Sequence, residues 1–304
     1  MIMILIGPIF FVCWFISVDA RQEGNRQKQD PVEQIKQGNF SLKASQQPGP
    51  LMSFGQNMVD KNDTQLFVIV DDLQGQNRQL VTVIPTVLHG LRDDFSLYIQ
   101  LPIVAKFQEN YGSIMRGVQD LLVQLEWAFY DKTTVDTTNQ ISLVGNMTVP
   151  TGSSPELDFR VGPRLFGSYG TPTFFIGFTA NYFTPEWYPF VSAGVKLMTP
   201  NDTIQYGHQY LYQWGLSKNI CYRADRYIFN IMIEFDGTYR QKNMVRGVIN
   251  QNSGGNQILF GPSLWYSTPH WNIQAGCSWY VYQQLYGVQN KDNYIVSVDV
   301  GYKF

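Results

Sequence analysis

The last eleven residues of this 304-residue chain alternate between apolar and polar side chains and end in an aromatic residue. The apolar positions are Tyr294, Val296, Val298, Val300, Tyr302 and Phe304. Because successive side chains of a β-strand point to opposite faces, one face of this segment is apolar, and the other carries Asp299 and Lys303. A C-terminal strand of this kind is typical of bacterial outer-membrane proteins, so we predict that Tyr302 and Phe304 form part of an insertion signal.

The same two-residue rhythm recurs upstream in at least four segments. These segments are 95–103, 121–129, 229–235 and 271–279. One such stretch fits a half-buried strand of any kind, but many of them without a comparable helical stretch indicate a closed sheet. Most of the candidate strands that contain such segments run for about 10 to 15 residues, longer than the strands of soluble proteins, and a tilted membrane strand needs about 9–11.

We therefore predict an all-β fold, a transmembrane antiparallel up-and-down β-barrel of about twelve strands, with ten or fourteen as alternatives. The predicted strands lie at about 64–72, 78–88, 94–105, 118–130, 139–150, 158–168, 172–184, 203–217, 226–240, 256–267, 270–282 and 293–304. Connections in such barrels alternate between short inner turns and longer outer loops. Stretch 190–198 also resembles a strand, but counting it inverts this alternation, so we assign it to an outer loop over 185–202. Pro85 and Pro163 fall inside predicted strands, where proline loses a ladder hydrogen bond.

Composition agrees with a barrel. Charged residues make up 15% of the chain and aromatic residues another 15%, whereas soluble domains have roughly 25% charged residues. The mean hydropathy of −0.18 excludes a bundle of membrane helices, but a barrel exposes every second residue to a polar interior. The net charge of −2 gives no indication of a nucleic-acid partner. Cys221 and Cys277 are expected to be unpaired thiols.

The N-terminus divides into two segments. Residues 1–18 are almost wholly apolar and are followed by Asp19-Ala20, which predicts a cleaved signal peptide over 1–20, although no basic residue precedes the apolar run. An uncleaved anchor is the alternative. Residues 21–63 are rich in glutamine over their first half, and we expect a polar periplasmic arm without a fold of its own. The barrel then spans 64–304.

Four short motifs occur in a recognisable order. They are Leu101-Pro102, Gly117-Val118-Gln119-Asp120-Leu121, Val149-Pro150-Thr151-Gly152 and Gly301-Tyr302-Lys303-Phe304. Their order and spacing resemble the outer-membrane transporter family of the phenol meta-degradation pathway type, over most of the chain after residue 64. The family's usual Gly-X-Gly-Asp reads Gly-Val-Gln-Asp here. The resemblance implies a barrel that admits hydrophobic or aromatic compounds; it does not make phenol the substrate.

Several polar residues are expected on the inner face of the barrel. They are Gln124, Glu126, Arg160, Arg164, Thr179, Asn181, Glu234, Asp236, Asp299 and Lys303. One interpretation is a network of salt bridges that stabilises a narrow lumen. The other is a constriction in which Arg160 and Arg164 face acidic residues and orient polar solutes.

The main functional prediction is an outer-membrane channel or transporter for small solutes, including hydrophobic or aromatic ones. The expected partners are outer-membrane lipids, the barrel-assembly machinery and the solute, with no nucleic acid, cofactor or metal. A structural barrel whose loops 185–202 and 241–255 bind partners is the alternative. A barrel hydrolase is a third class, but no catalytic residues are predicted, because His89, His208 and His270 lack the sequence context of outer-membrane phospholipases.

Overall fold

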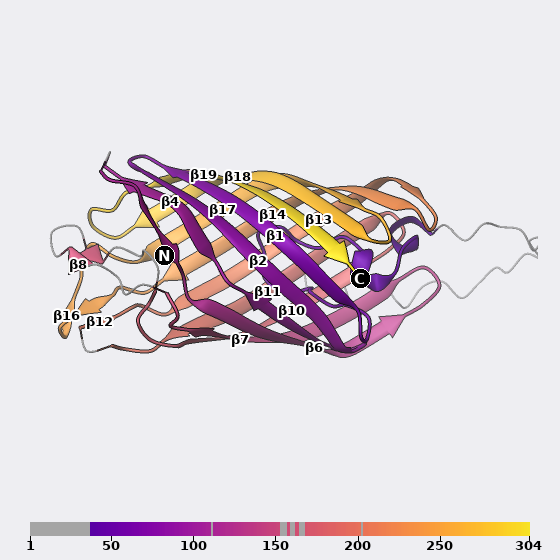
Figure 1. Ribbon diagram of the computed structural model, residues 1–304, viewed down its shortest axis with the longest axis horizontal. Coiled ribbons are helices and arrows are strands. Elements are labelled where there is room, and N and C mark those ends of the chain that lie inside the picture. The colour runs from indigo at the N-terminus through magenta and orange to yellow at the C-terminus, as the bar shows by residue number, and fades with distance from the viewer. Residues whose placement is uncertain (1–36, 111, 153–156, 159–161, 164–167, 202) are drawn as a thin grey trace, which may run out of the picture. The chain divides into compact units, whose positions relative to one another are not determined.

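A computed structural model describes residues 37–304 except 111, 153–156, 159–161, 164–167 and 202. The chain forms one closed antiparallel barrel (Figure 1). Its wall consists of β1 (Thr64–Gly75), β2 (Arg78–Arg92), β3 (Phe95–Gln100), β4 (Ile103–Glu109), β5 (Met115–Val118), β6 (Leu121–Thr133), β7 (Thr138–Val149), β10 (Thr173–Phe183), β11 (Trp187–Met198), β13 (Gln209–Arg223), β14 (Tyr227–Arg240), β17 (Gly255–Ser267), β18 (Trp271–Leu285) and β19 (Asp292–Lys303).

These fourteen segments make twelve strands of the wall, which confirms the predicted number. The pair β3 and β4 acts as one strand interrupted at Leu101-Pro102, because β2 pairs with both. The pair β5 and β6 is likewise interrupted at Gln119-Asp120. Pro85 lies in β2 opposite the first interruption, so its missing N–H falls where the ladder with β3 and β4 is already broken.

The barrel closes between the first and last strands. β1 pairs with β2 on one side and with β19 on the other, in a register that sets Gln65 opposite Lys303. Two short 3-10 helices, η2 (Gly38–Phe40) and η3 (Ala44–Gln46), precede the first strand. No helix among the described residues is long and apolar enough to cross a membrane.

Two of the predicted wall assignments were wrong, and they compensated for each other. The segment 187–198, predicted as part of an outer loop, is strand β11 and pairs with β10 and β13. The segment 158–168, predicted as a wall strand, is not in the wall, because β7 pairs directly with β10 along its length. Of that segment the structure describes Asp158, which lies in β8 (Leu157–Asp158), Gly162 and Pro163, which form β9 (Gly162–Pro163), and Ser168; β8 and β9 pair in a separate small sheet.

The two ends of the barrel differ in their connections. At the end that bears Phe304, which we call the C-terminal end, strands are joined by the short turns 93–94, 134–137, 184–186, 224–226 and 268–270. At the opposite, loop end the connections include 150–172, 199–208 and 241–254. The last two supply the three-stranded sheet of β12 (Ile204–Gln205), β15 (Met244–Val245) and β16 (Val248–Ile249). Short turns on one side and long loops on the other are typical of outer-membrane barrels.

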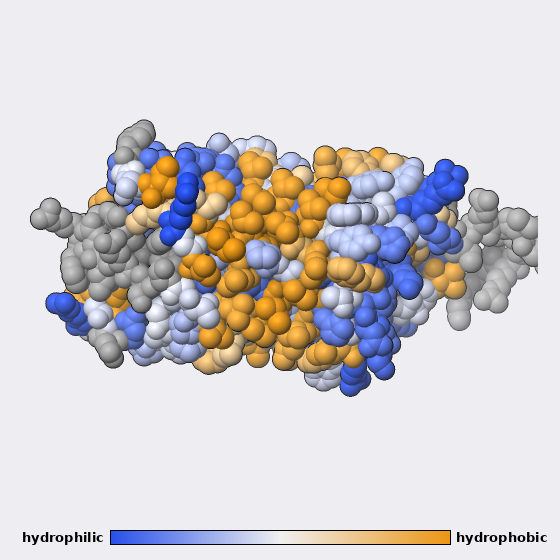
Figure 2. All heavy atoms as spheres, in the orientation of Figure 1, coloured by the Kyte–Doolittle hydropathy of each residue, from blue (hydrophilic) through white to orange (hydrophobic). Residues whose placement is uncertain are grey.

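The outer surface of the wall carries a belt of apolar side chains. Figure 2 shows it as a continuous band between two more polar ends. Along β6, Leu125, Trp127 and Phe129 are exposed, while Gln124, Glu126 and Ala128 between them are buried. Because water would disfavour so large an apolar surface, this belt indicates contact with lipid. The alternation predicted from the sequence is thus confirmed on both faces.

A charge placed in the middle of the belt is expected to destabilise the barrel. Phe178 lies halfway along β10 with 46% of its surface exposed, so Phe178→Arg should reduce the free energy of unfolding by about 2–4 kcal/mol. Urea unfolding of the protein in lipid vesicles measures the change. Val288→Arg is the matched control, since Val288 is 86% exposed in the connection 286–291. Equal stability of the two variants would contradict the lipid-facing assignment.

Candidate functional site: a lumen filled by residues 37–63

The segment 37–63, which we call the plug, lies inside the barrel. Its contacts come from inward-facing side chains of strands all round the ring, including β3, β6, β10, β11, β13, β14, β17, β18 and β19. A segment that touches so many strands at once can only occupy the lumen. The sequence predicted a polar periplasmic arm over 21–63, and it did not indicate that residues 37–63 pack against the wall.

Glu234, on β14, binds three consecutive backbone N–H groups of the plug. Its carboxylate accepts hydrogen bonds from Leu51 at 2.9 Å, Met52 at 3.0 Å and Ser53 at 3.2 Å. Two residues further along the same face of β14, Asp236 accepts a hydrogen bond of 2.6 Å from the Ser53 hydroxyl. Hydrogen bonds to a charged acceptor are stronger than neutral ones, so this cluster is a principal attachment of the plug.

Glu126, on β6, holds the plug on the other side of the lumen. Its two carboxylate oxygens accept hydrogen bonds from the backbone N–H groups of Gln56 at 2.8 Å and Asn57 at 3.0 Å. Gly55 and Gln56 both have positive φ angles, 83° and 64°, and this turn directs the two N–H groups toward one carboxylate. In the ring four strands separate β6 from β14 on one side and six on the other, so the plug crosses the lumen between them.

Neither carboxylate has a basic partner in the part of the chain that the structure describes. Glu126 and Glu234 are each only 1% exposed, and among the described residues no ion pair involves them or Asp236. A buried carboxylate without a counter-ion is costly unless hydrogen bonds satisfy it. The plug supplies those hydrogen bonds through its backbone, so plug and wall depend on each other for polar satisfaction.

Ser45 and Asp63 of the plug bind the two strands that close the barrel, β1 and β19. Lys303 of β19 forms an ion pair of 2.5 Å with Asp63 and donates a hydrogen bond to the Ser45 hydroxyl. Gln65, opposite Lys303 in the ladder, donates to the Ser45 carbonyl. The Ser45 hydroxyl in turn contacts the Asp63 carboxylate at 3.2 Å. Both chain ends of the barrel therefore meet on one residue of the plug.

Apolar contacts complete the attachment. Phe40 packs against a buried cluster of Phe183, Tyr188, Phe190 and Met232 near the C-terminal end. Further along, the ring of Phe54 meets that of Phe175 edge-on, with centroids 4.7 Å apart. Burial of such side chains stabilises the docked plug through the hydrophobic effect.

A glycine permits the plug to leave the lumen close to the wall. Residues 59 and 60 pass so near Gly90 on β2 that a Cβ atom there would lie 2.2 Å from the Asp60 carbonyl oxygen. The backbone N–H of Asn62 donates to the Gly90 carbonyl at 2.8 Å, and the Gly90 N–H donates to the Asp63 carbonyl at 3.0 Å. Just before β1 begins, the plug therefore makes a backbone contact with β2 that a side chain at position 90 would prevent.

The structure brings together some of the predicted lumen residues and not others. Glu126, Glu234, Asp236 and Lys303 all contact the plug, as does Thr179, which accepts a hydrogen bond of 3.0 Å from Gln56. Asp299 is half-buried on the inner face of β19. Arg160 and Arg164 lie outside the described residues, and the wall strand predicted to carry them is absent from the ring. Tyr302 stacks edge-on against Trp271 and Phe304 on the outer face.

Sequence reasoning missed several plug contacts on the wall. Gln213 accepts a hydrogen bond from the Phe54 N–H at 3.0 Å, Gln274 donates to the Gly49 carbonyl at 3.1 Å, and Ser96 accepts from the Val59 N–H at 3.2 Å. These are serine or glutamine side chains at inward-facing positions of strands whose residues alternate between the two faces. Their position in the alternation marks them as inward-facing, but nothing in the sequence separates them from the other polar residues of the lumen.

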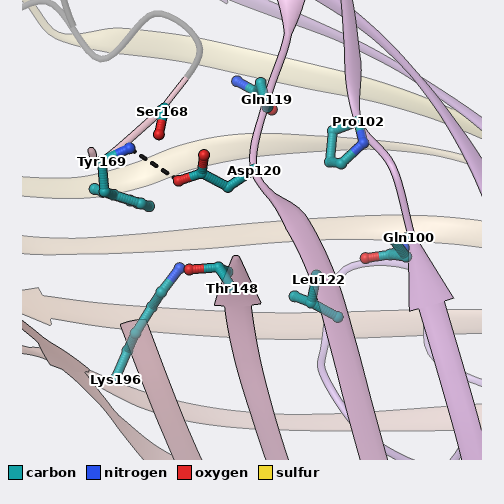
Figure 3. A pocket seen from close by; sticks show the side chains of 9 residues that line it. All are labelled: Gln100, Pro102, Gln119, Asp120, Leu122, Thr148, Ser168, Tyr169 and Lys196. Carbon is teal, nitrogen blue, oxygen red and sulfur yellow. Dashed lines mark hydrogen bonds between the residues drawn. The ribbon is translucent and has the colours of Figure 1, made fainter. Parts of the chain in front are cut away.

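A cavity of about 200 Å³ opens on the wall near the loop end, beside the two interrupted strands. It is lined by Gln100, Pro102, Gln119, Asp120, Leu122, Thr148, Ser168, Tyr169 and Lys196 (Figure 3). Thr148 and Lys196 lie near the loop-side ends of β7 and β11, and Leu122 lies at the start of β6. The residues that interrupt the wall, Pro102, Gln119 and Asp120, therefore form one side of the cavity.

The charged groups of this cavity are arranged asymmetrically. Asp120 is buried and its carboxylate accepts backbone hydrogen bonds from Gly152 at 3.3 Å and Tyr169 at 2.9 Å. The Lys196 ammonium lies 4.8 Å from the centre of the Tyr169 ring. Beside the cavity, burial together with Tyr169 and Asp120 raises the pKa of Tyr206 to about 12, so Tyr206 stays neutral at physiological pH.

The three histidines have local structural partners. His89 pairs with the Thr64 hydroxyl at 2.9 Å, His208 accepts a hydrogen bond of 3.1 Å from the Met198 N–H, and His270 lies 3.4 Å from the Lys303 carbonyl. Each therefore joins adjacent strands near an end of the barrel. Cys221 and Cys277 are both free thiols, as expected.

The closed ring of twelve strands, the apolar belt and the polar lumen define a β-barrel of the bacterial outer-membrane type. Among solved structures it is similar to the COG4313 outer membrane channel from Pseudomonas putida F1, with a TM-score of 0.67 and 14% identity over 84% of this chain and 100% of that chain. The NanC porin is more distant, with a TM-score of 0.46 and 11% identity over 79% of this chain and 98% of that one. No family model and no curated protein matches the sequence. At these identities the likeness shows the fold.

Proposed function

We propose that the protein is an outer-membrane channel for small solutes, including apolar and aromatic ones, and that the plug controls passage through its lumen. The carrying observation is that the plug crosses a polar lumen on two carboxylates, Glu126 and Glu234, rather than through a covalent link. A purely structural barrel could fill its lumen with wall side chains. A separate segment held by hydrogen bonds can move aside while the wall stays intact.

The sequence and the cavity at the loop end support the solute class, and a structural neighbour supports the channel activity. The sequence resembles a family of barrels that admit hydrophobic or aromatic compounds. The COG4313 barrel, whose fold this chain shares, is itself called an outer membrane channel. In this chain the cavity at the loop end combines apolar Pro102 and Leu122 with the Tyr169 ring, surfaces that suit a solute with an apolar body.

Locking the plug should abolish transport. Ser53 and Asp236 are in contact at 2.6 Å through their side chains, so Ser53→Cys with Asp236→Cys, in a chain whose own Cys221 and Cys277 are replaced by Ser, places two thiols within reach of a short bis-methanethiosulfonate cross-linker. Cells that express the cross-linked variant should take up the fluorescent apolar probe phenylnaphthylamine no faster than cells without the protein. Reduction of the cross-link should restore the rate of the serine-only control. Uptake through the cross-linked barrel at the control rate would refute plug-controlled passage.

A second candidate function rests on the sheet at the loop end. Val248 and Ile249 of β16 are 71% and 52% exposed, on a hairpin that extends beyond the wall. Exposed apolar residues on a loop suit a protein partner. Of the two loops predicted to bind partners, 241–255 carries this hairpin, whereas most of 185–202 is strand β11.

A further inference from the structure

We infer that the cavity at the loop end binds a small carboxylate with an apolar or aromatic body, and that Lys196 is the residue that recognises its charge. This inference rests on the proposed function, because it assigns a solute class to the cavity of a channel. It goes beyond that function in requiring a negative charge on the solute.

The first support is the state of the Lys196 ammonium. The ammonium lies over the face of the Tyr169 ring, 4.8 Å from its centre. No carboxylate of the described residues lies within ion-pair distance of it. A cation over an aromatic face keeps most of its hydrogen-bonding capacity, since the ring occupies one direction only. Figure 3 shows Lys196 among the side chains that line the cavity, with its ammonium end toward the other lining residues.

The second support is that the acidic residue of the cavity does not neutralise Lys196. Both Asp120 oxygens accept backbone hydrogen bonds, one from Gly152 and the other from Tyr169, and the side chain is buried. Two N–H donors stabilise its negative charge in place. Within the described part of the chain, a carboxylate ligand therefore finds a cation without a counter-ion on one side and a satisfied aspartate on the other.

The third support is the chemistry of the remaining lining. Leu122 and Pro102 present apolar surface and Gln100 presents an amide group, whereas the Thr148 hydroxyl is already bonded to the Thr173 side chain at 2.6 Å. A ligand with one charged end and one apolar end would match both parts, and about 200 Å³ limits it to roughly the size of a substituted benzoate. An inorganic anion would leave the apolar side unfilled.

Calorimetric titration of the refolded full chain in detergent tests the inference with three probes of one shape: benzoate, benzyl alcohol and benzylammonium. We expect benzoate to bind, and the alcohol and the ammonium to bind at least about tenfold more weakly, because neither has a carboxylate to accept the charge-assisted hydrogen bond from Lys196. Lys196→Met should weaken benzoate binding by about tenfold or more, and Lys196→Arg should retain it.

The matched control is Lys218→Met. Lys218 also lies over an aromatic ring, 4.9 Å from that of Trp187, but near the C-terminal end of the barrel and away from the cavity. The inference would be overturned if the wild type and Lys196→Met bound benzoate equally, or if the wild type bound benzyl alcohol as tightly as benzoate. Equal losses of benzoate affinity in Lys196→Met and Lys218→Met would also overturn it. If the barrel transports phenylnaphthylamine but benzoate does not bind, the inference fails and the proposed function stands. If benzoate binding depends on Lys196 but the barrel does not transport phenylnaphthylamine, the carboxylate site stands and the proposed channel function fails.

Discussion

Deleting residues 37–60 should raise the single-channel conductance of the barrel by roughly tenfold, because the plug occupies the lumen between Glu126 on β6 and Glu234 on β14. The deletion leaves Asp63, the ion-pair partner of Lys303, in place. Recording in planar bilayers gives the conductance. Slower migration after boiling, compared with an unheated sample, would show that the shortened chain still forms a closed barrel.

The control for this deletion shortens the molecule outside the lumen. Removing 244–249 takes away the hairpin of β15 and β16 at the loop end, which belongs to a separate small sheet. This variant should conduct as the full chain does. If the plug-deleted barrel folds and still conducts no better than the wild type, other parts of the chain close the lumen and the plug is not the gate.

Replacing Glu234 with alanine is expected to loosen one half of the plug selectively. The substitution removes the acceptor of three partly buried backbone N–H groups, and each group left unsatisfied costs about 1–3 kcal/mol. Hydrogen exchange at residues 51–53 should therefore accelerate by about a hundredfold or more. Mass spectrometry of peptides from the folded barrel measures the exchange rate.

The matched variant Glu126→Ala tests the other side of the lumen. It should accelerate hydrogen exchange mainly at Gln56 and Asn57, whose backbone N–H groups donate hydrogen bonds to Glu126. Glu234→Gln keeps one carbonyl oxygen as an acceptor and should give an intermediate effect. Protection that stays unchanged at 51–53 in Glu234→Ala would mean that the carboxylate does not hold the plug.

The fold was predictable where one face of a strand meets lipid and the other meets polar groups. On β19, every second residue from Tyr294 to Phe304 obeys this division, so the strand and its direction followed from the sequence. Most of β11 was recognised as strand-like over 190–198, but it was assigned to an outer loop because a wall strand predicted at 158–168 left no place for it in the alternation of turns and loops. Its inward residues Tyr188, Phe190 and Met198 pack against Phe40 of the plug or against the loop residues Ile204 and Tyr206, partners that the local pattern does not reveal.

The site was predictable only in part, for a related reason. Alternation placed Glu126, Glu234, Asp236 and Lys303 on the inner face, and the structure places them there. What they bind did not follow, since a polar segment with few apolar residues normally lacks the means to fold. The plug becomes ordered because the wall offers acceptors for its backbone N–H groups, and such complementarity depends on the closed barrel as a whole.

The covalent continuity between the plug and β1 has a consequence for how the lumen reopens and closes. A plug that has left its carboxylates remains tethered at Thr64 and samples only a small volume around the barrel mouth. Short flexible tethers produce effective concentrations in the millimolar range. The plug thus acts as its own intramolecular competitor, and a solute that is to keep the passage open must be more abundant there, or bind more tightly, than the returning chain.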